Sequence, residues 1–418
     1  MRDALDCARC AAAAAPSLAG ADSQMRSAAI VAAADRLLAR ASDVIEANGR
    51  DMARAVEAGM SAPLRDRLLL DEGRVASMAA SMREVAAQPD PLGRVIGGRT
   101  LDSGIRMEQV TVPLGVVAIV YEARPNVTAD AIALCLRSGN ACVLRGGSAA
   151  AESCEAIADA CVEGVVSVGL PRDSCTLVTK PGHEQTTELM HANGLVDVLI
   201  PRGGASLIRA CLEGSTVPVI ETGMGNCHIY IESSADVEMA RDIVVNAKTS
   251  RPGVCNAAES LLCDRAIAEK ALPVVCAALS ERGVELVGDP EAVGIATSHG
   301  VPMSHASEED WGTEYLDLKM SVRCVSGVEE AISCINHYGT GHSECIVSSD
   351  YDASERFLRG VDAAAVYVNA STRFTDGGMF GLGTEIGIST QKLHVRGPMG
   401  ASALTSTKYL LRGEGQTR

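Results

Sequence analysis

Gly115-Val-Val-Ala-Ile-Val-Tyr121 is a short, continuous apolar run, and a helix-like segment at 129–137 follows it. The same alternation of short apolar runs with helical segments continues for about a hundred residues. Further strands are expected at 141–145, 176–179, 196–200 and 217–221, and further helices at 152–166, 184–192 and 206–212. Short apolar strands that alternate with helices predict a parallel, doubly wound sheet.

A second series of the same kind begins at Cys227–Ile231. Its expected strands continue at 260–263, 284–287, 321–325, 345–348 and 364–368, and its helices lie at 237–248, 266–280, 328–337 and 353–359. The sequence therefore predicts an α/β protein with two Rossmann-like domains. We expect the first over residues 1–226, the second over 227–370, and a tail, 371–418, that returns to the first domain or to a subunit interface.

The segments that flank the first series have a different character. Residues 24–48 carry apolar side chains at the spacing of one helix face. Residues 92–112 contain Gly97 and Gly98 and then alternate through Ile105, Met107 and Val110. This second pattern predicts a hairpin or a strand arm that stands off the main body and serves oligomerisation.

Composition bounds the possible functions. The 418 residues carry a formal net charge of −16, which disfavours nucleic acid as a partner because polyanion binding needs a basic face. No apolar run is long enough for a membrane span, and the 15 cysteines without an export signal favour the cytoplasm. Cys7 and Cys10 form a C-x-x-C pair, for which a mobile, alanine-rich start is the simpler interpretation. The scattered histidines show no metal-ligand spacing, so we expect no metal.

Two turns have the composition of phosphate-binding turns. Arg145-Gly146-Gly147-Ser148 and Arg202-Gly203-Gly204 each follow an expected strand and precede an expected helix. Each would place backbone N–H groups and an arginine at the carboxyl edge of the sheet, where parallel sheets bind ligands. The alternative is a tight crossover in which the glycines only supply positive φ. No complete G-x-G-x-x-G fingerprint is present, so the residues alone leave a dinucleotide site open.

Two further segments carry candidate catalytic side chains. Cys255 lies in Thr249-Ser-Arg-Pro-Gly-Val-Cys-Asn-Ala, a loop between an expected helix and strand, where a thiol can be accessible. Asn126 lies in Tyr121-Glu-Ala-Arg-Pro-Asn-Val-Thr, at a strand end. It is either a helix N-cap or an amide donor to a developing oxyanion.

These segments, in this order, resemble the γ-glutamyl phosphate reductase (glutamate-5-semialdehyde dehydrogenase) family of the aldehyde dehydrogenase superfamily. The resemblance extends over nearly the whole chain and includes Val368-Asn-Ala-Ser-Thr-Arg-Phe-Thr-Asp-Gly-Gly and the run from Phe380 to Gly400. It implies the aldehyde dehydrogenase fold, NADPH as cofactor, and the reduction of L-glutamyl 5-phosphate to L-glutamate 5-semialdehyde in proline biosynthesis. It also implies a homo-oligomer and, because the substrate is labile, a glutamate 5-kinase that works nearby.

The resemblance also assigns roles to residues. It implies that Cys255 is the nucleophile and forms a thioester, and that Asn126 and the Cys255 N–H form the oxyanion hole. It places Arg145-Gly-Gly-Ser148 near the adenosine ribose, Arg202-Gly-Gly204 near the pyrophosphate, and Glu314 at the nicotinamide ribose. For the substrate we expect Arg124 and Arg251 to receive the phosphate, and Ser371 and Arg373 to hold the amino-acid end; these arginines could equally brace the loops.

Two other functions stay open from the sequence. Glu221 stands where aldehyde-oxidising relatives keep the glutamate that activates water, so hydrolytic oxidation of a small aldehyde is one alternative. We expect Glu221 to be a strand-end carboxylate without catalytic duty. A non-catalytic scaffold that retains the fold is the other alternative.

Overall fold

The computed structural model describes residues 1–418, except for the side chains of Ala62 and Pro63. The chain divides into two compact units. Unit 1 comprises residues 1–222, 380–387 and 398–418, and unit 2 comprises residues 223–379 and 388–397. The C-terminal segment thus contributes to both units.

Unit 1 is built on a four-stranded parallel sheet in the order β5-β4-β3-β6. Its helices and 3-10 turns are α1 (Ala4–Gly20), α2 (Ser23–Ala39), α3 (Ala41–Glu57), α4 (Ala62–Leu68), α5 (Glu72–Ala87), α6 (Asn126–Arg137), η1 (Ser148–Ala150), α7 (Ala151–Ser167), η2 (Arg172–Ser174), α8 (Glu184–Met190), α9 (Ala205–Gly214) and η5 (Ala401–Leu404). Its strands are β1 (Val95–Thr100), β2 (Arg106–Pro113), β3 (Val116–Tyr121), β4 (Ala141–Gly146), β5 (Cys175–Leu177), β6 (Val198–Arg202) and β16 (Thr405–Arg412).

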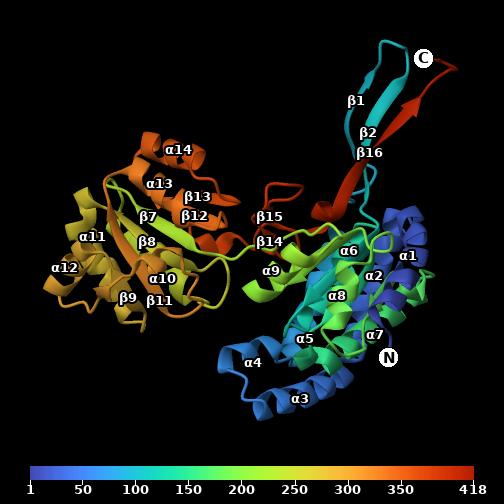
Figure 1. Cartoon of the computed structure of the whole chain (residues 1–418), viewed down its shortest axis with the longest axis horizontal. Helices are drawn as coiled ribbons and strands as arrows, with labels where there is room; N and C mark the ends of the chain where they lie inside the picture. The colour runs from blue at the N-terminus through green and yellow to red at the C-terminus, as the bar shows by residue number, and fades with distance from the viewer. The chain divides into compact units, whose positions relative to one another are not determined.

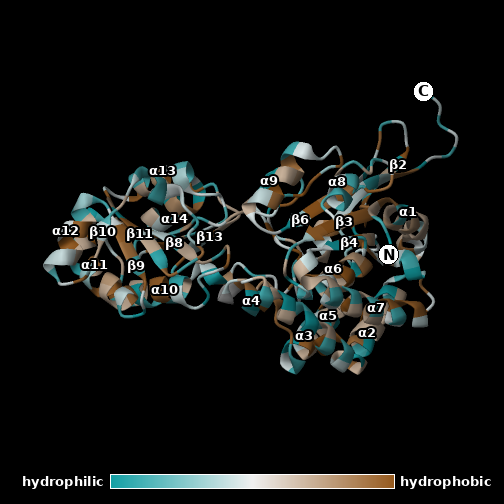
Figure 2. Cartoon of the chain, turned by 60° about the horizontal axis from the view of Figure 1, so that its bottom comes forward, coloured by the Kyte–Doolittle hydropathy of each residue, from teal (hydrophilic) through white to brown (hydrophobic). Residues whose placement is uncertain are grey.

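The centre of unit 1 is apolar throughout. Every residue of β3 is buried, and Figure 2 shows β3 and β6 in the colour of hydrophobic residues. Helix α6 is buried from Val127 to Arg137, because α2 and α5 cover the side that does not contact the sheet. The N-terminus forms α1, which packs on β3, β4 and β5. The expected mobile start is therefore wrong: Cys7 is buried, and its thiol donates to the Leu177 carbonyl over 3.4 Å.

The expected strand at 217–221 is also wrong. This segment makes one isolated bridge between Val219 and Leu199, beside β6. Pro218 accepts a hydrogen bond from the Leu199 N–H through its carbonyl, but it has no N–H of its own to extend the ladder. The segment is therefore a proline-interrupted sheet edge.

The arm predicted at 92–112 is an antiparallel hairpin, β1 with β2. Its third strand comes from the other end of the chain, because β16 pairs with β2 over eight residues. Figure 1 shows these three strands extending away from the helices of unit 1. All six residues of β1 are exposed, so β1 is an uncovered sheet edge.

Unit 2 is built on a seven-stranded parallel sheet in the order β10-β9-β11-β8-β7-β12-β13. Its strands are β7 (Cys227–Ile231), β8 (Ala258–Asp264), β9 (Glu285–Gly288), β10 (Ser304–His305), β11 (Lys319–Val325), β12 (Ser343–Val347), β13 (Ala365–Val368) and the separate short β14 (Ile388–Ser389), which pairs with β15 (Gly397–Pro398). Its helices and 3-10 turns are α10 (Val237–Thr249), α11 (Arg265–Ser280), α12 (Pro290–Ser298), η3 (Glu308–Gly312), α13 (Val328–Tyr338), α14 (Tyr351–Gly360) and η4 (Thr372–Phe374).

Helices cover both faces of this sheet. Ile229, Ile231 and Leu261 pack with α10, α11 and α12 on one face. Tyr230 and Leu262, one residue further along their strands, pack with α13 and α14 on the other face. This alternation follows from the two-residue period of a strand. The parallel, doubly wound fold class predicted from the sequence is confirmed.

Candidate active site

The phosphate-type turns of unit 1 meet at one edge of its sheet. Tyr121, at the end of β3, pairs in register with Gly146 of β4 and with Arg202 of β6. The turns that follow these strands, 122–126, 147–148 and 203–204, are therefore neighbours. Helix α6 begins at Asn126, turn η1 at Ser148 and helix α9 at Ala205, where these turns end. This carboxyl edge is where parallel sheets usually bind ligands.

The glycines of these turns serve close packing. None of Gly146, Gly147, Gly203 and Gly204 has a positive φ, so the alternative that they only supply this conformation is wrong. A Cβ atom on Gly203 would lie 2.7 Å from the Glu122 carboxylate carbon, and one on Gly147 would lie 3.2 Å from the Glu122 Cα. The glycines thus let the backbone approach a neighbouring group closely, as an anion-binding turn requires.

An anionic side chain occupies one of these turns. Glu122 Oε2 accepts the Gly204 N–H over 2.9 Å, at the N-terminus of α9. A carboxylate is favoured at this position by the helix dipole and by the unsatisfied N–H groups. The turn is therefore able to hold negative charge, which supports a site for a phosphate-bearing cofactor. Glu122 lies in the segment 121–128 that was singled out from the sequence, but no role was predicted for this residue.

The two arginines of the turns differ in what they contact. Arg145 donates to the Gly146 carbonyl and, over 3.1 Å, to the Gly182 carbonyl. Burial lowers the pKa of Arg145, which stays charged at neutral pH because its ordinary value is so high. Arg202 is half-buried, and its charge acts on Asp130 of α6. Both guanidinium groups therefore lie at the carboxyl edge beside the glycine turns.

Asn126 is the first residue of α6 and its side chain is not the helix cap, so the N-cap interpretation is wrong. The residue is exposed, and its Nδ2 donates to Asp130 Oδ2 over 3.1 Å. Asp130 also accepts from Thr384 Oγ1 over 3.1 Å. Burial raises the pKa of Asp130 to about 6, although both hydrogen bonds oppose the rise. One N–H of the Asn126 amide is thus held in place, and the amide has a second N–H to donate.

In unit 2 the candidate residues gather at the opposite kind of edge. Cys255 lies between the end of α10 and the start of β8, Gly225 precedes β7, and Glu314 precedes β11. Strand starts of a parallel sheet lie at one edge, so these three residues share its amino-terminal edge. Cys255 is partly exposed, whereas most of the other cysteines are buried. The expected loop position of Cys255 is confirmed.

The backbone of Cys255 rests directly on the segment before β7. A Cβ atom on Gly225 would lie 1.5 Å from the Cys255 carbonyl oxygen, so only glycine fits there. The Cys227 thiol donates to the same carbonyl over 3.2 Å. Gly225 donates its own N–H to Glu314 Oε1 over 2.7 Å. Gly225 and Cys227, to which sequence reasoning gave no role, therefore support the backbone of the candidate nucleophile.

Two arginines lie in or against the loop that carries Cys255: Arg251 belongs to the loop, and Arg373 donates to the next residue, Asn256. Burial lowers the pKa of Arg373, and the charge of Arg251 lowers it further, whereas the carboxylate of Asp376 raises it. The negative form of Cys255 also raises the pKa of Arg373. Arg251 is exposed, while Arg373 is half-buried and donates to Asn256 Oδ1 and to Ser250 Oγ. A thiolate or a phosphate is favoured between such arginines.

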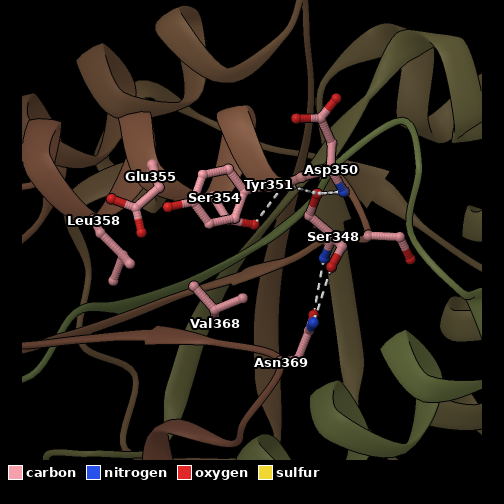
Figure 3. A pocket seen from close by; sticks show the side chains of 9 residues that line it. Ser348, Asp350, Tyr351, Ser354, Glu355, Leu358, Val368 and Asn369 are labelled. Atoms are coloured by element: carbon pink, nitrogen blue, oxygen red, sulfur yellow. Dashed lines mark hydrogen bonds between the residues drawn. The ribbon is translucent and has the colours of Figure 1, made fainter.

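The remaining candidates lie in different surroundings. Ser371 is buried, and its hydroxyl accepts the Arg373 N–H over 3.3 Å at the start of η4. Arg124 and Glu221 belong to unit 1, and both are half-buried. Unit 2 has an open cleft of about 390 Å³ at the carboxyl ends of β12 and β13. Figure 3 shows that Ser348, Asp350, Tyr351 and Asn369 line it, and Cys255 is not among its lining residues.

Comparison with known proteins places this chain in a family. The aldehyde dehydrogenase family model matches residues 3–317. A curated γ-glutamyl phosphate reductase of Clostridium beijerinckii is 53% identical over 390 residues, 93% of each chain. The chain belongs to the aldehyde dehydrogenase family, in its γ-glutamyl phosphate reductase branch.

Solved structures of this family agree with the fold. The crystal structure of γ-glutamyl phosphate reductase from Thermotoga maritima is 42% identical and superimposes with a TM-score of 0.95 over 100% of both chains. An acetylating aldehyde dehydrogenase from Geobacillus thermoglucosidasius shares the fold at 21% identity, with a TM-score of 0.70 over 99% and 97% of the two chains. Membership of this family implies a nicotinamide cofactor.

The described residues also bear on metal binding and on membrane insertion. Among these residues, no three His, Cys, Asp or Glu side chains are grouped so that they could hold a metal ion. Within the same residues, no helix is long and apolar enough to cross a membrane.

Proposed function

We propose that this chain catalyses the NADPH-dependent reduction of L-glutamyl 5-phosphate to L-glutamate 5-semialdehyde and phosphate, in proline biosynthesis. One observation carries the proposal. Cys255 is a partly exposed cysteine in the loop that also carries Arg251, next to Asn256, which accepts from Arg373, in a chain that is 53% identical to a curated γ-glutamyl phosphate reductase. Neither hydrolytic aldehyde oxidation nor a scaffold role is favoured by these relatives.

Cys255 begins the reaction. Its thiolate attacks the acyl carbonyl, the C–O bond to phosphate breaks, and a thioester forms on the sulfur. Arg251 and Arg124 stabilise the departing phosphate, because a guanidinium group pairs with it through two hydrogen bonds. Arg373, with Ser371 at the start of η4, orients the amino-acid end of the substrate.

The cofactor would be held by unit 1. Arg145, Gly146, Gly147 and Ser148 would hold the adenosine ribose, and Arg202-Gly-Gly204 the pyrophosphate, at turns whose glycines already admit the carboxylate of Glu122. Glu314 would hold the nicotinamide ribose. The bound reduced nicotinamide supplies the hydride that turns the thioester into the aldehyde. The positive charge at these turns suits the additional phosphate of NADPH.

Asn126 and the backbone N–H of Cys255 stabilise the oxyanion that develops on the carbonyl oxygen. Such a donor typically lowers the barrier by about 3 kcal/mol, or a hundredfold in rate. Collapse of the tetrahedral species expels the Cys255 thiolate and releases the aldehyde. Hydrolysis plays no part in this sequence, so Glu221 has no catalytic duty in it.

The assembly and setting of the enzyme are also proposals. The exposed β1 edge can pair with a strand of a second copy, so we propose that the chain forms a homo-oligomer through its arm. A glutamate 5-kinase is proposed as the functional partner, because an acyl phosphate is short-lived. None of the 15 cysteines, all of which are described, forms a disulfide, and we propose the reducing cytoplasm as the location.

The reverse reaction tests the function. Reduction of NADP⁺ is followed with glutamate 5-semialdehyde, in the presence and absence of phosphate. The proposal requires turnover that depends on phosphate, because phosphate must accept the acyl group from Cys255. Equal rates without phosphate would instead indicate a hydrolytic oxidase, and no turnover by the folded protein would indicate a scaffold.

A further inference from the structure

A fully buried ion pair joins the two ends of the loop that carries Cys255. Lys248 Nζ lies 2.5 Å from Glu259 Oε2, and both side chains are 0% exposed. Lys248 is in the last turn of α10, and Glu259 is the second residue of β8. The pair therefore closes the base of the segment 249–258, which contains Arg251 and Cys255.

The position of Glu259 in its strand is irregular. Cys227 pairs with Ala258, and the next residue of β7, His228, pairs with Ser260. Glu259 is thus an extra residue in β8, a β-bulge beside the candidate nucleophile. A bulge changes the direction in which a side chain points, and here the carboxylate lies against Lys248.

The second oxygen of Glu259 extends the connection. Oε1 accepts the Leu316 N–H over 3.2 Å, and Leu316 has a φ of 55°, which is uncommon for a residue other than glycine. Two residues earlier, Glu314 accepts the Gly225 N–H, and Gly225 lies against the Cys255 backbone. The Glu259 carboxylate thus connects the loop 249–258 to the segment 314–316. This segment in turn contacts Gly225, which packs against the backbone of Cys255.

Such a pair is not explained by stability alone. Burial raises the pKa of Glu259 to about 7 and lowers that of Lys248, so the charged forms of both groups are disfavoured by their surroundings. Apolar residues of similar volume are often as stabilising as a buried ion pair, or more so. The geometry that the pair imposes on the loop offers a reason for charged residues at these positions.

We propose that Lys248 and Glu259 are positioning residues that fix the Cys255 loop and the 314–316 segment in one productive arrangement. The inference rests on the proposed function in one respect, namely that Cys255 is the reacting thiol. Both side chains are fully buried, so the pair would act through the backbone of the loop and not by contact with the substrate. Its loss should therefore lower kcat far more than it changes KM for the cofactor.

The test uses two variants of the full-length protein. Lys248→Met with Glu259→Leu removes both charges at similar volume, so no unpaired charge remains buried. Glu259→Asp keeps both charges but shortens the carboxylate by one methylene. Lys319→Met is the matched control. The Lys319 ammonium nitrogen lies 5.3 Å from the centre of the Tyr315 ring, and that of Lys248 lies 6.0 Å from the same ring. Lys319, however, pairs with Glu285 on the surface. Thermal unfolding, steady-state kinetics and the rate of Cys255 alkylation by iodoacetamide, resolved by peptide, are measured for each.

We expect the double variant to unfold at the temperature of the unmodified protein or above. Its kcat should fall about a hundredfold, the cost of a displacement of about 1 Å at a reacting group, and its Cys255 alkylation rate should change about tenfold. The proposal would be overturned if the stable double variant had a kcat and a Cys255 alkylation rate that are both within twofold of those of the unmodified protein. Should this variant not fold, Glu259→Asp is judged by the same criteria. Alkylation of Cys255 does not require turnover. The alkylation rates therefore test the positioning role of the pair even if the protein does not catalyse the proposed reaction.

Discussion

Replacing Gly225 by alanine should disable the enzyme without unfolding it. The added Cβ would lie 1.5 Å from the Cys255 carbonyl oxygen and 2.8 Å from its Cα, whereas such contacts essentially never fall below 3.0 Å. Cys255 or Gly225 must therefore move by about 1.5 Å. Because Glu314 accepts the Gly225 N–H and so holds Gly225 in place, we expect part of this shift to fall on the loop that carries Cys255. A displacement of about 1 Å at a reacting group typically costs a hundredfold in rate, so kcat should fall at least that far.

Gly294→Ala is the matched control. Gly294 lies inside α12 of the same unit, and a Cβ there would meet nothing within 4 Å. This variant should keep full activity and gain about 0.5–1 kcal/mol of stability, because alanine is the better helix former. Turnover is measured as phosphate-dependent NADP⁺ reduction with glutamate 5-semialdehyde, and folding by circular dichroism. A Gly225→Ala protein with kcat within threefold of the unmodified enzyme would refute the reasoning.

Three more variants probe single groups of the two units. Cys255→Ser should fold normally but lose semialdehyde turnover, and a rate equal to that of the unmodified protein would exclude the thioester route. For Asp130, burial raises the pKa to about 6, so the contribution of this group to stability falls as pH rises from 4 to 6, and Asp130→Asn lacks this contribution. Urea unfolding measures the free energy of unfolding of both proteins at pH 4 and at pH 7. Between these two pH values, the difference between the variant and the unmodified protein should shift by up to about 3 kcal/mol in favour of Asp130→Asn, since the pKa is raised by about two units at about 1.4 kcal/mol each. A difference that does not change with pH would contradict this. Glu122→Gln removes the negative charge at the Gly204 N–H, so KM for NADPH should fall about threefold or more if this turn binds the pyrophosphate, and an unchanged or higher KM would argue against that placement.

The parts of the fold that depend on local pattern were predictable from the sequence. Short apolar runs between helices correctly indicated two parallel sheets, and the alternation through Val110 correctly indicated the arm. The strand expected at 217–221 failed where Pro218 removes a backbone donor. The third strand of the arm, β16, could not be derived because its partner β2 lies about three hundred residues earlier in the chain.

The candidate site shows the same limit. The glycine turns of unit 1 follow a general rule about carboxyl edges, and the structure brings them together as that rule predicts. In unit 2 the same rule leads to the cleft at Ser348 and Asn369, and not to Cys255. Sequence reasoning located Cys255 from its loop composition and from the family resemblance. The contacts of Gly225, Cys227 and Glu259 with this loop depend on tertiary packing, which leaves no mark in the local sequence.

The place of Cys255 in unit 2 also determines what its arginines must do. Reactive thiolates are commonly stabilised by a helix N-terminus, where the dipole is positive. The loop of Cys255 instead follows the C-terminal end of α10, whose carbonyl groups carry partial negative charge and disfavour a thiolate nearby. Arg251 and Arg373 bring positive charge to the same loop, which opposes the partial negative charge of the helix end. In the proposed reaction, the arginines of this edge would serve two purposes: they would favour the thiolate before the reaction, and they would favour the phosphate that the thiolate displaces.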